Sequence, residues 1–131
     1  MTSHLYDGDE HFPPAPVLEI SIGKPGEQAG GSTFLALVDT GADATIIPVE
    51  HLAQNRAQKV DQSAALRSHW GERRLVALYA VAMGIGPYQF PAIQVVGDEV
   101  GNEVVLGRNV LNRLRLLLDG PAGVTEILEK I

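Results

Sequence analysis

The sequence predicts a mostly β domain of about seven to nine short strands. Three observations support this fold class. The 131 residues include fourteen glycines and eight prolines, which divide the chain into short elements joined by turns. Apolar residues make up 45% of the chain, and most of them are Val, Ile, Leu and Ala in runs of strand length. This length suits one domain with a modest core, and no linker divides the chain.

The first half of the chain is expected to begin with an arm and then form short strands. Residues 1–15 are largely polar and close with two prolines, so we expect a flexible or extended arm before a domain over residues 16–131. Alternating apolar residues predict strands over 17–22 and 33–38, joined by a glycine-rich loop. A third short strand is predicted over 45–47. Pro48 suits the first position of a short helix over 49–54.

The second half is expected to form hairpins and one further helical turn. Two β-competent segments, 64–68 and 73–83, flank a glycine-containing tip and predict a long hairpin, whereas 55–62 is polar and predicts no element. Pro91 marks an edge or a bulge in the next strand. The remaining predicted elements are strand 88–96, strand 104–106, a helical turn within 107–113, and a closing hairpin of 114–118 with 124–131.

Composition excludes several classes of function. A net charge of −6 argues against a nucleic-acid partner. The absence of cysteine excludes disulfides, thiolate nucleophiles and cysteine-ligated metals. The four histidines have no metal-like spacing, so we expect neither a metal nor another cofactor. The N-terminal residues lack the basic and apolar regions of a secretory signal, and no apolar stretch reaches membrane-spanning length. The sequence therefore predicts a soluble cytoplasmic protein without a membrane partner.

One tripeptide, Asp39-Thr40-Gly41, points to chemistry. It follows the apolar run 35–38, and a carboxylate at the end of a buried strand is costly unless it is hydrogen-bonded, paired or functional. Two carboxylates about 3 Å apart share one proton, so the pair can act as general base and general acid at once. The chain contains this tripeptide once. A two-fold symmetric homodimer would bring two copies together.

A wider pattern resembles a known family. The residues Ala-Leu-Val-Asp-Thr-Gly-Ala-Asp at 36–43 are followed by Ile46-Ile47, and Val-Val-Leu-Gly-Arg-Asn-Val-Leu stands at 104–111. Together with the hairpin between them, these motifs resemble the retropepsins, the homodimeric aspartic proteases of retroviral type, and in particular their bacterial members. The resemblance spans roughly residues 17–131. It implies a closed acid-protease barrel with one short C-terminal helix, one lobe per chain, and endopeptidase activity on a peptide or protein substrate.

The resemblance also implies roles for individual residues. Asp39 would be the catalytic carboxylate and would meet its copy in the second subunit, while Thr40 would brace the two loops across the dimer axis. Gly41 would form main-chain bonds to bound peptide. Further substrate contacts are implied for Ala42, Asp43, Trp70, Gly71 and Arg108, with Asp43 and Arg108 also forming an ion pair. The hairpin around residues 64–80 would be a flap that closes over the substrate. Its tip, Ser68–Glu72, is more polar than the glycine-rich, apolar tips of viral enzymes.

Other interpretations stay open on sequence alone. Asp39 could be a structural turn residue, and Asp43 and Arg108 could form a purely structural ion pair. Trp70 could pack on its own hairpin instead of anchoring a ligand. The alternative function is a catalytically silent module of the same fold that binds peptides or mediates dimerisation.

Overall fold

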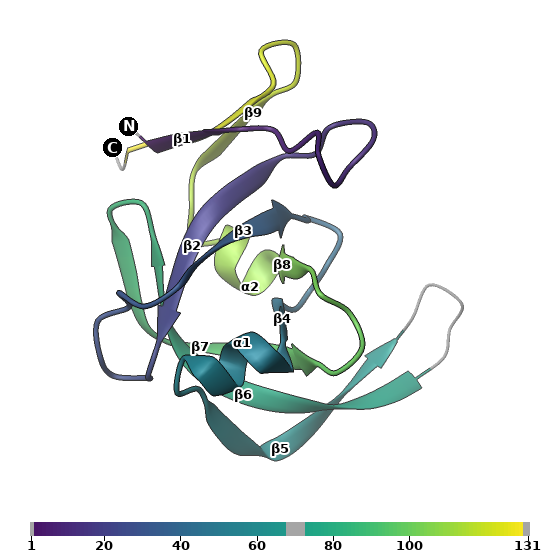
Figure 1. Cartoon of the computed structure of the whole chain (residues 1–131), viewed down its shortest axis with the longest axis vertical. Helices are drawn as coiled ribbons and strands as arrows, with labels where there is room; N and C mark the ends of the chain where they lie inside the picture. Colours follow the sequence, from purple (N-terminus) through teal and green to yellow (C-terminus); the bar gives the residue numbers. More distant parts are fainter. Residues whose placement is uncertain (1, 68–72, 130–131) are drawn as a thin grey trace.

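A computed structural model describes residues 2–67 and 73–129 of the chain (Figure 1). Ten short strands and two short helices follow one another in this described part. In chain order they are β1 (Thr2–Leu5), β2 (Val17–Gly23), β3 (Thr33–Val38), β4 (Ile46–Pro48), α1 (Val49–Gln54), β5 (Gln58–Arg67), β6 (Arg73–Ile85), β7 (Tyr88–Asp98), β8 (Val104–Leu106), α2 (Arg108–Leu111), β9 (Leu116–Asp119) and β10 (Val124–Ile127). The predicted mostly β class is confirmed.

The main sheet closes into a barrel. Its strands follow the order β2-β3-β8-β4-β7-β6-β5, and β2 also pairs with β6. Six strands therefore form a closed ring, and β5 continues outside it as the edge partner of β6. Closure removes the free edges of the six strands in the ring, which an open sheet would expose.

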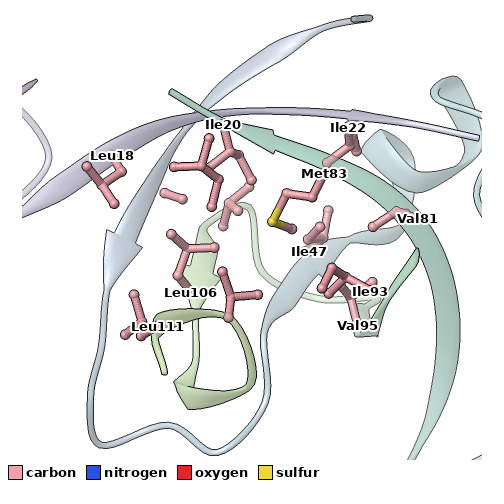
Figure 2. Close-up of a cluster of buried hydrophobic side chains, with 14 of the residues drawn as sticks. Leu18, Ile20, Ile22, Ile47, Val81, Met83, Ile93, Val95, Leu106 and Leu111 are labelled. Atoms are coloured by element: carbon pink, nitrogen blue, oxygen red, sulfur yellow. The ribbon is translucent and has the colours of Figure 1, made fainter. Parts of the chain in front are cut away.

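Alternating side chains fill the barrel (Figure 2). Leu18, Ile20 and Ile22 point inward from β2 and are almost fully buried, while the intervening Glu19 is exposed. Met83 of β6 and Ile47 of β4 meet them in the centre of the cluster. Truncating one of these large buried side chains to alanine would cost about 2–5 kcal/mol of folding free energy.

Several elements begin and end where the sequence predicts. The strand over 33–38, the helix over 49–54 and the strand over 104–106 have the expected bounds. Pro48 is the N-cap of α1, one residue before the expected position. The predicted irregularity at Pro91 is a bulge: Val81 pairs with Ile93 and Met83 pairs with Phe90, so two residues of β7 oppose one residue of β6.

The long hairpin is present, but its first strand begins earlier than expected. β5 starts at Gln58, within a segment whose polarity predicted no element. Gln58 and Lys59 are exposed and pair with Ala80 and Tyr79. Polar side chains are tolerated there because β5 is the outer strand of the sheet, so one of its edges has no neighbouring strand among the described residues.

The N-terminal residues lie in a second, three-stranded sheet of order β1-β10-β9. Thr2–Leu5 pairs antiparallel with β10, and Asp7 bridges Ala15 across the following loop. Residues 1–15, expected as a flexible or extended arm, thus contain an extended strand that is paired with the C-terminal hairpin. The start of β1 therefore lies beside the end of β10, where Thr2 pairs with Ile127. None of the helices in the described residues is long and apolar enough to cross a membrane.

Candidate active site

The end of β3 delivers Asp39 into a tight turn. β3 pairs in parallel with β8, and the Asp39 N–H continues this ladder by donating to the Leu106 carbonyl at 3.1 Å. The chain then turns, and the Ala42 N–H donates to the Asp39 carbonyl at 3.2 Å. The inward-facing residues of β3 are buried in the core, whereas the Asp39 side chain is half-buried at the surface of the barrel. The fold therefore places this carboxylate directly after the last paired residue of β3.

One carboxylate oxygen of Asp39 is bound within the turn and the other is available. Oδ1 accepts the Gly41 N–H at 2.9 Å. A Cβ at position 41 would lie only 3.2 Å from this oxygen, which explains why glycine suits the position. Oδ2 accepts no hydrogen bond from any part of the chain that the structure describes. The turn thus orients the carboxylate and leaves one oxygen free for a further partner.

The start of α2 supports the same turn from behind. The Arg108 N–H donates to the Ala42 carbonyl at 2.8 Å, and its guanidinium Nη1 donates to the Thr40 carbonyl at 2.9 Å. Gly107 packs so closely on Ala44 that an added Cβ would overlap the Ala44 backbone carbonyl. These contacts explain the glycine and arginine of the Gly107-Arg108-Asn109 sequence.

The ion pair predicted between Asp43 and Arg108 does not form. The Arg108 guanidinium binds the Thr40 carbonyl instead, and Asp43 is exposed without a charged partner in the described residues. The reason is geometric: the Arg108 backbone is fixed to Ala42, and its side chain extends toward the Asp39 end of the turn. Thr40 and Gly41 are also exposed, and Ala42 is half-buried. Trp70 and Gly71, both predicted to bind substrate, lie outside the described residues.

Thr45 and Asn109 are site-supporting residues that the sequence motifs did not assign. Thr45 is fully buried, and its hydroxyl donates to Asn109 Oδ1 at 2.8 Å while accepting the Gly107 N–H at 3.1 Å. Asn109 Nδ2 donates in turn to the Gln94 carbonyl of β7 at 2.9 Å. A hydroxyl residue at the head of the apolar run 45–47 was the available signal, because a buried hydroxyl in such a run needs a partner.

A second polar cluster lies outside this site and links distant segments of the chain. The His11 ring accepts or donates at both nitrogens, with Nδ1 3.1 Å from Asp7 Oδ2 and Nε2 2.6 Å from Glu103 Oε1. Hydrogen bonding to Glu103 and then to Asp7 raises the pKa of His11. The Asp7 carboxylate accepts a hydrogen bond from the Asp9 backbone N–H, and this bond is the main reason that the pKa of Asp7 is lowered. This cluster ties the loop before β2 to the loop before β8.

Comparison with known proteins places this geometry in context. A family model described as gag-polyprotein putative aspartyl protease matches residues 28–113, which include the Asp39 turn, the β5–β6 hairpin and Gly107-Arg108-Asn109. No curated protein sequence matches the chain.

Three solved structures share the fold. A retropepsin-like aspartic protease from Rickettsia conorii is 16% identical, with a TM-score of 0.64 over 96% of this chain and 88% of that chain. The EIAV protease complexed with the inhibitor HBY-793 is also 16% identical, with a TM-score of 0.61 over 82% and 91% of the two chains. The retroviral protease-like domain of Ddi1 from Leishmania major is 14% identical, with a TM-score of 0.53 over 86% and 87%.

Proposed function

This chain belongs to the family of gag-polyprotein putative aspartyl proteases, and from that premise we propose that it is an aspartic endopeptidase whose active site forms between two copies of the chain. The predicted retropepsin-like, one-lobe barrel is confirmed by the fold, including the short helix α2 near the C-terminus. Membership and fold make a hydrolase the leading class of function. Catalysis, dimerisation and the roles of individual residues are the proposed part.

The observation that carries the proposal is the half-satisfied carboxylate of Asp39. A single chain supplies one such carboxylate, with Oδ1 fixed by Gly41 and Oδ2 free in the described residues. Thr40 beside it is exposed, and its hydroxyl also has no partner there. A two-fold axis next to this turn would pair each Asp39 with its copy and let the two Thr40 hydroxyls brace the loops.

The chemistry follows from two carboxylates that share one proton. Because both cannot ionise at close range, one Asp39 is charged and the other is protonated. The charged carboxylate takes a proton from the water between them, and the resulting hydroxide attacks the scissile carbonyl carbon. The protonated carboxylate donates its proton to the carbonyl oxygen. The tetrahedral intermediate then collapses. The leaving nitrogen takes a proton from the carboxylate that removed one from water, and one hydroxyl of the intermediate returns a proton to the other carboxylate, which restores the pair.

An extended peptide substrate fits the surroundings of the turn. Gly41, Ala42 and Asp43 lie on the exposed side of the turn, where they would bind the peptide main chain in a strand-like manner. The β5–β6 hairpin would act as the flap, with Trp70 and Gly71 at its tip, and its closure would exclude water from the site. Arg108 would act on substrate through the Thr40 carbonyl that it holds. The cytoplasmic location predicted from the sequence stays part of this proposal.

A peptide-library assay tests the activity. The wild-type protein should cleave a subset of peptides, and Asp39→Asn should abolish cleavage because the variant dimer has two neutral amides and no carboxylate to activate water. Asp9→Asn, an exposed aspartate in the N-terminal loop, is the matched control and should keep activity. Cleavage that survives Asp39→Asn would refute the protease mechanism. Peptide binding without cleavage at any pH would favour the catalytically silent module.

Subunit mixing tests the shared site. If each active site needs Asp39 from both copies, equal amounts of wild type and Asp39→Asn should leave about one quarter of the dimers fully wild type after exchange. Activity per wild-type chain should therefore fall to about half of its value without the variant. An unchanged activity per wild-type chain, or a strictly monomeric protein in sedimentation with peptide bound, would contradict the proposal.

A further inference from the structure

A small pocket lies where the β5–β6 hairpin leaves the barrel. Its volume is about 250 Å³, smaller than the roughly 300–1,000 Å³ of pockets for drug-sized ligands, so it suits one side chain. One wall comes from β6, another from β4 and β7, and the rim from the loop after β7. The lining residues are Ile46, Leu75, Val76, Ala77, Val96, Gly97, Asp98 and Glu99.

The walls of this pocket are aliphatic. Ile46 and Val96 are register partners in β4 and β7, and they line the pocket together with Ala77 and Val76 from the hairpin. Leu75 lines the same pocket and is 80% exposed. Covering Leu75 with the stem of a bound side chain would remove apolar surface from water.

The rim is negatively charged, and its two acids differ in what they bind. Oδ1 of Asp98 accepts the N–H groups of Val100 and Gly101, both at 2.9 Å, so this carboxylate shapes the loop. Glu99 is exposed and has neither an ion pair nor a hydrogen bond in the described residues. Among the lining residues that the structure describes there is no lysine or arginine. Within the described part of the chain, the loop thus presents one uncompensated carboxylate beside the aliphatic side chains of the pocket.

We propose that this pocket is a specificity subsite that selects a lysine or arginine side chain of the substrate, with Glu99 as the specificity-determining residue. The inference rests on the proposed protease function, because Ile46 follows the Asp39 turn along the chain and the other wall belongs to the proposed flap. Lysine and arginine bury an aliphatic stem while keeping the charged end in solvent. That division matches a pocket whose lining combines aliphatic side chains with two carboxylates, and an acidic substrate side chain would be repelled.

Binding to the inactive protein tests the subsite without catalysis. Fluorescent peptides that differ at one position, with Lys, Arg, Leu, Gln or Glu there, would be titrated onto Asp39→Asn. We expect the basic peptides to bind more tightly than the Gln peptide by about two- to fivefold, the size expected for an exposed ion pair. The preference should shrink at high ionic strength, since salt screens exposed charges. Equal binding of the Lys and Gln peptides at low salt would overturn the proposal.

A second substitution identifies the residue responsible. On the Asp39→Asn background, Glu99→Gln should remove the preference for basic peptides and leave the Leu peptide unaffected, and Glu99→Lys should invert the preference toward Glu. Glu50→Gln, at an exposed glutamate on α1, is the matched control and should change nothing. A preference that persists in Glu99→Gln would overturn the assignment to Glu99.

Cleavage assays separate failure of this inference from failure of the proposed function. With Asp39 intact, kcat/KM for the same peptides should show the same Glu99-dependent order. Cleavage that depends on Asp39 but ignores Glu99 would refute the subsite and leave the protease intact. Glu99-dependent binding without any cleavage would refute the protease and leave the subsite intact.

Discussion

The Thr45 hydroxyl donates to Asn109 Oδ1 across 2.8 Å and joins β4 to α2 behind the Asp39 turn. The same hydroxyl accepts the Gly107 N–H, so one buried oxygen links the residue before β4 to the start of α2. The turn that carries Asp39 precedes Thr45 in the chain and is bound to α2 by the Arg108 N–H, which donates to the Ala42 carbonyl. Its shape therefore depends on a hydrogen-bond network that never touches the carboxylate.

Thr45→Val should destabilise the fold and lower activity. It leaves the Gly107 N–H without its acceptor in a buried position, which costs about 1–3 kcal/mol. Thermal denaturation would report the loss as a lower Tm, and activity per folded molecule would report any displacement of Asp39. Thr125→Val is a matched control, because Thr125 is equally buried but its hydroxyl has no hydrogen-bond partner in the described part of the chain. That control should be neutral or stabilising. Equal losses in both variants would contradict the role given to Thr45.

Gly107→Ala should also be destabilising, for a different reason. The backbone at Gly107 is extended, with φ of −93°, so the cost is not conformational strain. It comes from the overlap of the new Cβ with the Ala44 carbonyl, which cannot move without displacing β4. Overpacking of this kind costs about 1–3 kcal/mol or more. Gly120→Ala, where a Cβ would meet nothing within 4 Å, should keep the wild-type denaturation midpoint.

Arg108→Lys should reduce activity more than stability. The guanidinium reaches the Thr40 carbonyl while the Arg108 backbone is already bound to Ala42, and an ammonium on a lysine stem cannot reproduce that geometry. Because Arg108 is exposed, we expect a loss of about 1 kcal/mol in transition-state stabilisation, or about fivefold in kcat/KM. Arg115→Lys provides the control. An unaltered kcat/KM in Arg108→Lys would show that the Thr40 contact does not support catalysis.

The His11 cluster should make stability depend on pH in a defined window. The folded pKa of His11 is raised above 6.5, so its contribution is complete below that value and is lost as pH rises through the folded pKa. The folded pKa of Asp7 is lowered below 3.8, so its contribution is present above that value and is lost as pH falls through the folded pKa. The contribution of the cluster should be largest between about pH 4 and 6.5.

Denaturation across pH would measure this window, with His11→Gln as the variant. The difference in stability between wild type and His11→Gln should be largest inside the window and should narrow above it. Asp9 and Glu10 line the same surface cavity as Asp7, His11 and Glu103, so the field there is acidic and favours the protonated ring. His4→Gln is the control. A stability difference that does not vary with pH would contradict the assignment to ring protonation.

Local signals predicted much of this fold. Apolar runs bounded by glycine and proline located β3, α1 and β8, and Pro91 correctly marked a bulge. The Asp39 turn could be recognised because Asp39, Thr40 and Gly41 both shape the turn and match the sequence motif of the proposed catalytic site. What local patterns could not predict was long-range pairing. The partner of β1 is β10, at the other end of the chain. The Arg108 guanidinium donates to the Thr40 carbonyl and not to the carboxylate of Asp43.

The number of strands that pair with β6 changes along its length. From Ala82 to Ile85 it pairs with β2, and from Leu78 to Ile85 it pairs with β7, whereas residues 73–77 pair only with β5. Because residues 73–77 have one neighbouring strand and the rest of β6 has further partners, we expect the proposed flap to bend at Ala77–Leu78. Ala77 is also a wall of the small pocket beside Glu99. A substrate side chain bound in that pocket would therefore contact the bending point of the proposed flap, and this contact would couple substrate binding to flap closure.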